Sequence, residues 1–267
     1  MHSLIKKIWI VGNPSGSETR QTQPMVFDGS LEIVIAEHAG FSLLTSQNRL
    51  DYSEGIFLGG QISQRISLEL KPGARLIFIK VDPWVLGPSS HRPLHELQNR
   101  CTPLLTVLPD LHRRLVRLRP GTSPALIEMV INHWIETESR RPEKAALAAY
   151  AVRQLSNTAD EPKRTKRQLL EALSISSRTL EGAFATMVGI PPTRFATLAR
   201  LRAITEKLIY EGTPDSLTRV AMDHGFFDQA HFSRAIKTFS GTHATAITDQ
   251  ALFVPNSQEG FRIFTIQ

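Results

Sequence analysis

The sequence predicts an α+β protein with a small N-terminal β-barrel or sandwich module, a helical connector, and an all-α C-terminal domain with two helix-turn-helix units. Short runs of Ile, Val and Leu, separated by Gly, Pro and Asn turns, fill residues 1–99. From residue 100 onward, apolar residues recur instead at spacings of three and four, which is typical of helices. A length of 267 residues suits two domains.

The N-terminal module is predicted to contain six strands, at residues 8–11, 31–36, 41–45, 56–58, 62–70 and 75–81. In the fifth of these, Ile66, Leu68 and Leu70 alternate with polar residues, as expected of a strand with one buried face. Several short strands at this spacing indicate a small barrel or sandwich.

Residues 100–141 form the predicted helical connector. Leu108, Leu111 and Leu115 repeat at helical spacing, and Ser123 followed by Pro124 is a typical start for a second helix. These apolar stripes need burial, either on the β module or against a second subunit. We expect at least one of them to contribute to a homodimer interface.

Residues 216–244 show the pattern of a helix, a tight turn and a second helix. Gly225 is placed to end the first helix in a left-handed turn, and Asp228 is suited to cap the second. Phe232 and Ile236 share the inward face of the second helix. Its remaining surface carries residues that contact bases and phosphates in DNA-binding proteins, namely Gln229, His231, Ser233, Arg234 and Lys237.

A second copy of this pattern lies upstream, at residues 165–184. An apolar helix is followed by a turn, a Ser176 cap, and a helix with Leu180 and Phe184 on its inward face. A helical stretch at residues 193–210 links the two copies. Such a linker would hold two recognition helices about 34 Å apart, one turn of DNA.

These residues resemble the AraC/XylS family of bacterial transcription regulators. The resemblance covers residues 142 to about 248 and rests on Ser176-x-Arg178-x-Leu180-x-x-x-Phe184, Gly189-Ile190-Pro191, Arg200-Leu201-Arg202-Ala203, Val220-Ala221-x-x-x-Gly225-Phe226-x-Asp228-Gln229 and His231-Phe232-Ser233-Arg234-Ala235-x-Lys237. It implies a seven-helix DNA-binding domain at residues 142–250 and a sensor or dimerisation role for the β module. The chain departs from the pattern at Ser174 and Ala244, where the family has glycine and proline. It also departs at Gly182 and Ala183, where the family usually carries basic or other polar residues on the recognition helix.

The chemistry of the side chains on the two recognition helices predicts which residues contact double-stranded DNA. They are Ser177, Arg178, Thr179 and Glu181 in the first unit and Gln229, His231, Ser233, Arg234 and Lys237 in the second. An arginine can donate two hydrogen bonds to guanine, a glutamine pairs with adenine, and a glutamate accepts from the N4 amine of cytosine.

The overall charge favours a polyanionic partner. The formal net charge is +6 and the isoelectric point is near 9.7, and basic residues near phosphates release counterions. Lys163, Arg164, Lys166 and Arg167 form a dense basic cluster at the start of the first unit. This cluster is either a solvated surface or a phosphate contact.

Other classes of function have little support in the sequence. Cys101 is the single cysteine, which excludes a disulfide framework and fits a reducing cytoplasm. No apolar run is long enough to span a membrane. His91 and His95 are four residues apart, but Pro93 between them favours extended backbone. No catalytic or nucleotide-binding motif occurs, so we expect no enzyme activity, no cofactor and no metal.

The leading hypothesis is a cytoplasmic transcription regulator that binds DNA as a homodimer. The resemblance favours an activator, which would contact RNA polymerase, and a small-molecule effector in the β module. The alternative is a ligand-binding β module whose degenerate helical domain serves protein interaction, motivated by Gly182 and Ala183 in the first unit. The tail at residues 251–267 has one candidate strand, at residues 261–266.

Overall fold

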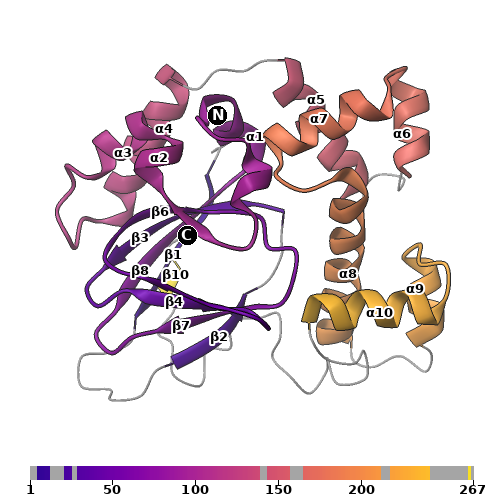
Figure 1. Ribbon diagram of the computed structural model, residues 1–267, viewed down its shortest axis with the longest axis horizontal. Coiled ribbons are helices and arrows are strands. Elements are labelled where there is room, and N and C mark those ends of the chain that lie inside the picture. Colours follow the sequence, from indigo (N-terminus) through magenta and orange to yellow (C-terminus); the bar gives the residue numbers. More distant parts are fainter. Residues whose placement is uncertain are drawn as a thin grey trace.

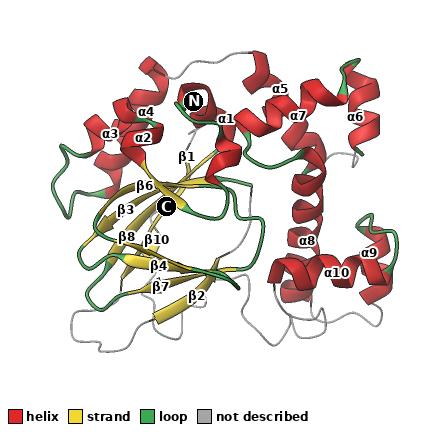
Figure 2. Cartoon of the chain, viewed as in Figure 1, coloured by secondary structure: helices red, strands yellow, loops and turns green. Residues whose placement is uncertain are grey.

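The computed structural model describes residues 5–12, 21–25, 29–138, 143–156, 165–211, 217–240 and 264–265 (Figure 1). The strands are β1 (Ile5–Gly12), β2 (Gln21–Met25), β3 (Leu31–Glu37), β4 (Phe41–Leu44), β5 (Arg49–Tyr52), β6 (Gly55–Gly59), β7 (Ile66–Leu70), β8 (Arg75–Val81), β9 (Cys101–Pro103) and β10 (Phe264–Thr265). The helices are α1 (Pro83–Leu86), η1 (Gly87–Ser89), η2 (Leu94–Leu97), α2 (Leu104–Val107), α3 (Pro109–Leu115), α4 (Pro124–Glu138), α5 (Glu143–Leu155), α6 (Lys166–Leu173), α7 (Ser177–Met187), α8 (Pro192–Glu211), α9 (Leu217–Asp223) and α10 (Gln229–Ser240). Strands gather in one half and helices α5 to α10 in the other (Figure 2).

The β module is a sandwich of two antiparallel sheets and not a closed barrel. One sheet has the strand order β10-β1-β8-β3-β6-β9 and the other β2-β7-β4-β5. All six predicted strands are present, but the fifth begins at Ile66 and not at residue 62 as predicted. The sequence prediction missed β2, β5 and β9, because Gln-Thr-Gln-Pro-Met, Arg-Leu-Asp-Tyr and Cys-Thr-Pro carry few β-branched residues.

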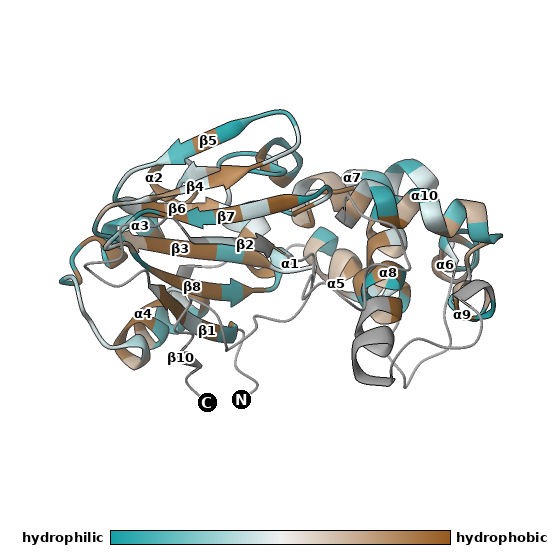
Figure 3. Ribbon diagram, turned by 90° about the horizontal axis from the view of Figure 1, so that it is seen from below, coloured by the Kyte–Doolittle hydropathy of each residue, from teal (hydrophilic) through white to brown (hydrophobic). Residues whose placement is uncertain are grey.

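Strand β8 lies at the centre of the larger sheet and is buried on both faces. Ile77 and Ile79 pack toward the connector helices, whereas Leu76 and Phe78 pack toward the smaller sheet. In Figure 3, β3 and β8 are therefore hydrophobic along most of their length, and the edge strand β5 is largely hydrophilic. A strand covered on both sides loses the alternation of polar and apolar residues.

The connector helices pack in cis on the larger sheet. Leu111 in α3 and Ile131 in α4 are fully buried, and Leu115 and Trp134 nearly so, in one cluster with the sheet. The expectation that one of the predicted stripes faces a second subunit was wrong for these residues, because the apolar face of the sheet already covers them. On the outer side of α4, Met129 is 60% exposed.

The segment between the sheet and the connector joins the two halves of the molecule. Pro93, between His91 and His95, has an extended ψ of 131°, and residues 94–97 after it form the 3-10 helix η2. Trp84 of α1 packs against both the β-module core and the helical core. A Cβ atom on Gly87 would lie 3.0 Å from the Cα of Met187, so a larger residue there would require the two segments to shift by a few tenths of an ångström.

Candidate nucleic-acid interface

Helices α9 and α10 form the predicted second helix-turn-helix unit. Gly225 has a φ of 78° and reverses the chain after α9. The amide of Phe226 then donates to the carbonyl oxygen of Ala221 (3.0 Å), which completes a Schellman-type helix end. Asp228 caps α10, since its Oδ1 accepts the amide hydrogen of His231 at 2.6 Å. The predicted roles of Gly225 and Asp228 are both confirmed.

Three of the five candidate side chains of this unit are exposed to solvent. Gln229, Arg234 and Lys237 are exposed, whereas Phe232 and Ile236 are buried in the helical core. His231 and Ser233 are partly buried. The ring of His231 packs against Phe226 with centroids 5.2 Å apart. The structure therefore separates the five candidates of this unit into three outward residues and two that flank the core.

Helices α6 and α7 form the first unit on the same plan. Thr165 and Gln168 make a reciprocal capping box at the start of α6. Ser174 takes the left-handed conformation (φ 51°) that glycine holds in the second unit. Ser176 caps α7 by accepting the amide hydrogen of Thr179 at 3.1 Å. The turn thus forms without glycine, at a local conformational cost.

The candidate residues of α7 differ in their exposure and in their hydrogen bonds. Arg178 and Thr179 are exposed, and Ser177 is partly buried. Glu181 accepts hydrogen bonds from Lys166 Nζ (2.6 Å) and from Ser177 Oγ (3.0 Å). The hydrogen bond from Lys166, followed by that from Ser177, lowers the pKa of Glu181. This carboxylate therefore ties α6 to α7.

The interpretation of Ala183 as a DNA-facing departure was wrong. Ala183 is fully buried, on the same face as Leu180 and Phe184, because it follows Leu180 by three residues on the helix. Gly182 is exposed, and a Cβ atom there would meet no other atom within 4 Å. The first recognition helix therefore lacks one outward side chain, not two.

Helix α8 joins the two units. Its 20 residues span about 30 Å at 1.5 Å per residue, with α7 near one end and α10 near the other (Figure 1). Arg194 and Arg200 of α8 both donate hydrogen bonds within the chain. Arg194 donates to the carbonyl oxygen of Ser63, and Arg200 to that of Gly225 (2.8 Å).

Arg200 supports the second unit, a role that was not predicted from the sequence. Its guanidinium lies 5.9 Å from the ring centre of Phe226, and burial lowers its pKa. The sequence signal for Arg200 was its place in the Arg200-Leu201-Arg202-Ala203 motif.

The basic cluster predicted at residues 163–167 is described only in part. Lys166 pairs with Glu181 and Arg167 pairs with Glu171, while Lys163 and Arg164 lie outside the described residues.

Residues 169–250 match the family model described as a helix-turn-helix domain. The chain carries an AraC-type helix-turn-helix domain. A sequence search of curated proteins finds no match. The described residues contain no group of three or more His, Cys, Asp or Glu that could hold a metal ion. No described helix has both the length and the apolar character needed to cross a membrane.

Solved structures similar to this chain include two of ToxT from Vibrio cholerae. One, at 1.65 Å resolution, has 11% identity and a TM-score of 0.47, and the match covers 91% of this chain and 98% of that one. The other, described as bound to an unsaturated fatty acid, has 12% identity and a TM-score of 0.44, with 96% and 100% covered. The AraC-like transcriptional activator CuxR has 12% identity and a TM-score of 0.34, with 80% of each chain covered.

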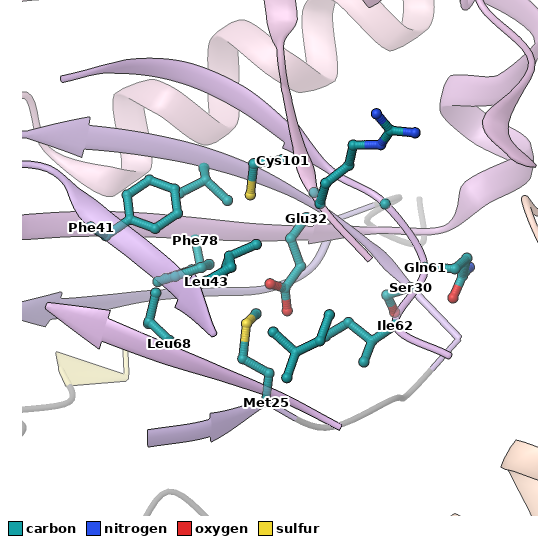
Figure 4. A pocket seen from close by; sticks show the side chains of 15 residues that line it. Met25, Ser30, Glu32, Phe41, Leu43, Gln61, Ile62, Leu68, Phe78 and Cys101 are labelled. Atoms are coloured by element: carbon teal, nitrogen blue, oxygen red, sulfur yellow. The ribbon is translucent and has the colours of Figure 1, made fainter. Parts of the chain in front are cut away.

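A second candidate site is a cavity of about 30 Å³ between the two sheets (Figure 4). Apolar side chains from both sheets line most of it, including Phe41, Leu43 and Phe78. Gln61 is 1% exposed, and its Nε2 donates to the carbonyl oxygen of Gly29 at 3.0 Å. Among the described residues, its Oε1 has no hydrogen-bond partner. Such a volume holds about one or two water molecules.

Proposed function

We propose that this protein is a sequence-specific transcription regulator that inserts α7 and α10 into neighbouring major-groove segments of double-stranded DNA. The observation that carries the proposal is the second unit of the AraC-type domain. Its α10 is capped by Asp228, exposes Arg234 and Lys237 on the side away from Phe232 and Ile236, and exposes Gln229 at its first residue. Recognition helices of this motif contact base edges from such a face.

Each exposed residue has a chemical role in this proposal. Gln229 pairs with adenine, and Arg178 and Arg234 each donate two hydrogen bonds to guanine. Lys237 contacts phosphate, with Ser177, Thr179, His231 and Ser233 in flanking positions. Glu181 would accept from cytosine only after its hydrogen bond with Lys166 opens.

We also propose that the protein is an activator, which binds DNA as a homodimer and contacts RNA polymerase. The exposed outer side of α4, with Met129 60% and Leu126 40% exposed, is the dimer surface that best fits the fold. Sedimentation equilibrium tests it: Met129→Glu should shift the protein toward the monomer. An unchanged mass would exclude this surface.

A small-molecule effector in the β module is part of the same proposal. The unpartnered Gln61 Oε1 in the inter-sheet cavity would accept a hydrogen bond from it. Because the cavity is small, binding requires the sheets to separate locally. A thermal-shift screen of small alcohols, amides and acids tests it, with Gln61→Leu as the variant that should lose any stabilisation.

We also propose that the chain divides into a β module (1–99), a connector (100–141), a DNA-binding domain (142–250) and a tail (251–267). Strand β9 extends the sheet into the connector, as far as Pro103.

Selection of bound fragments from randomised DNA by the purified protein, at two salt concentrations, tests DNA recognition. We expect one bipartite motif, with Gln229→Ala and Arg234→Ala each costing about 1–3 kcal/mol on it. Arg113→Ala is the charge-matched control, since Arg113 is an exposed residue of α3 whose side chain pairs with Asp110. Unchanged binding by both recognition variants would overturn the assignment.

The alternative of a helical domain used only for protein interaction gives a different result. A DNA-binding protein loses affinity steeply with rising salt, and Lys237→Ala should reduce that slope by about one unit for all sequences. Binding that is weak and enriches no motif would favour the alternative. Part of its motivation is gone, because Ala183 belongs to the core.

A further inference from the structure

The turns of the two helix-turn-helix units differ by one residue. In the first unit, the amide of Ile175 donates to Leu170 (3.3 Å), and in the second, that of Phe226 donates to Ala221 (3.0 Å). These are equivalent five-residue helix-ending bonds, so Ile175 and Phe226 occupy the same position. The cap of α7, Ser176, follows Ile175 directly, whereas Phe227 stands between Phe226 and the cap Asp228.

The additional residue has no place in the core. Phe226 is 3% exposed and packs against Phe232 with ring centroids 5.3 Å apart, so it fills the space beneath the turn. Phe227 is 86% exposed, the highest value for a large hydrophobic side chain among the described residues. A hydrophobic residue before a helix cap usually packs on the fourth helical residue, which here is Phe232. Phe226 has taken that position.

Phe227 lies at the end of α10 that also carries Gln229. Residues at this end of a recognition helix are the ones that meet base edges in the major groove. Ala230, three residues later, is also apolar and exposed. Among base edges in that groove, only thymine presents a methyl group, and phenylalanine is one of the side chains that contacts it.

We propose that Phe227 is a specificity-determining residue that contacts the C5 methyl group of a thymine in the DNA segment bound by α10. This inference rests on the proposed function. The free energy comes from apolar surface removed from water on both sides of the contact. The second half-site should therefore contain a thymine next to the base pair that Gln229 contacts.

The test uses the duplex that the wild-type protein selects, with each thymine of the second half-site replaced in turn by deoxyuridine, which lacks only the methyl group. At one or two positions the wild-type Kd should rise about threefold to fivefold, as expected for one buried methyl group. Phe227→Ala should bind the unmodified duplex about tenfold more weakly. Its affinity should be insensitive to deoxyuridine at those same positions.

Two controls separate the possible failures. Leu105→Ala removes another exposed apolar side chain, 53% exposed in α2, and should leave both affinities unchanged. The thermal unfolding curve of Phe227→Ala should match that of the wild type. The inference would be overturned if Phe227→Ala and the wild type were equally sensitive to deoxyuridine, or if neither were sensitive. In that case a loss of affinity in Arg234→Ala would show that the proposed function still holds. Failure of the wild type to select any duplex would instead overturn the proposed function and this inference with it.

Discussion

Gly189 and Leu94 meet backbone to backbone, since a Cβ atom on Gly189 would lie 3.0 Å from the carbonyl oxygen of Leu94. This contact seats the C-terminal end of the first recognition helix on the β module. His95 lies in the same seam, with Nδ1 3.4 Å from the carbonyl oxygen of Ala185. The seam therefore joins the first unit to the η2 segment.

Gly189→Ala should lower the free energy of unfolding by about 1–3 kcal/mol. The φ of Gly189 is 98°, which an alanine adopts only with strain, and the added methyl group would press on Leu94. Urea unfolding measures the change. Gly182→Ala is the matched control and should stabilise by about 0.5–1 kcal/mol, because this exposed helical glycine has open space around it. Equal stability of Gly189→Ala and wild type would contradict the close approach.

Asp228→Ala should destabilise the second unit by about 1 kcal/mol, because it removes the cap that accepts the amide hydrogen of His231. Hydrogen exchange of the His231 amide should become faster, and urea unfolding should report the loss. Asp228→Asn keeps an accepting oxygen and should behave like the wild type. If the His231 amide exchanges equally in all three proteins, the cap does not form in solution.

Lys166→Met should raise the pKa of Glu181 toward its usual range. The pKa of Glu181 is lower in the folded protein than in the unfolded chain, so the ion pair stabilises the fold at pH values above the unfolded pKa. This stabilisation is lost as the pH falls through the folded pKa. Carboxyl titration followed by NMR measures the pKa directly. The decrease in Tm between neutral and acidic pH should also be smaller in the variant. A Glu181 pKa that does not respond to Lys166→Met would show that the pair is absent.

Cys101 should resist alkylation in the native protein. Its side chain is buried, and burial, with a smaller effect of Glu32, raises the pKa of the thiol far above its usual value. Since only the thiolate reacts, iodoacetamide at mildly alkaline pH should label it in urea and leave it intact without urea. Mass spectrometry of both samples measures the alkylation of Cys101. Rapid alkylation in the native protein would mean that the sheet opens at its β9 edge.

The helix-turn-helix units could be predicted because their signals are local. Gly225, Asp228 and Ser176 act through hydrogen bonds to residues at most five positions away, and the periodic apolar residues around them mark the inward face. The central strand β8 was equally clear from its run of apolar residues.

Tertiary structure decided what each face contacts. Nothing in the sequence indicates that Arg194 reaches Ser63 or that Phe227 is left in solvent. Likewise, the connector stripes could have met a sheet or a second subunit with the same spacing. Periodicity encodes that a face needs burial, whereas its partner is set by contacts between residues far apart in the chain, which no local pattern contains.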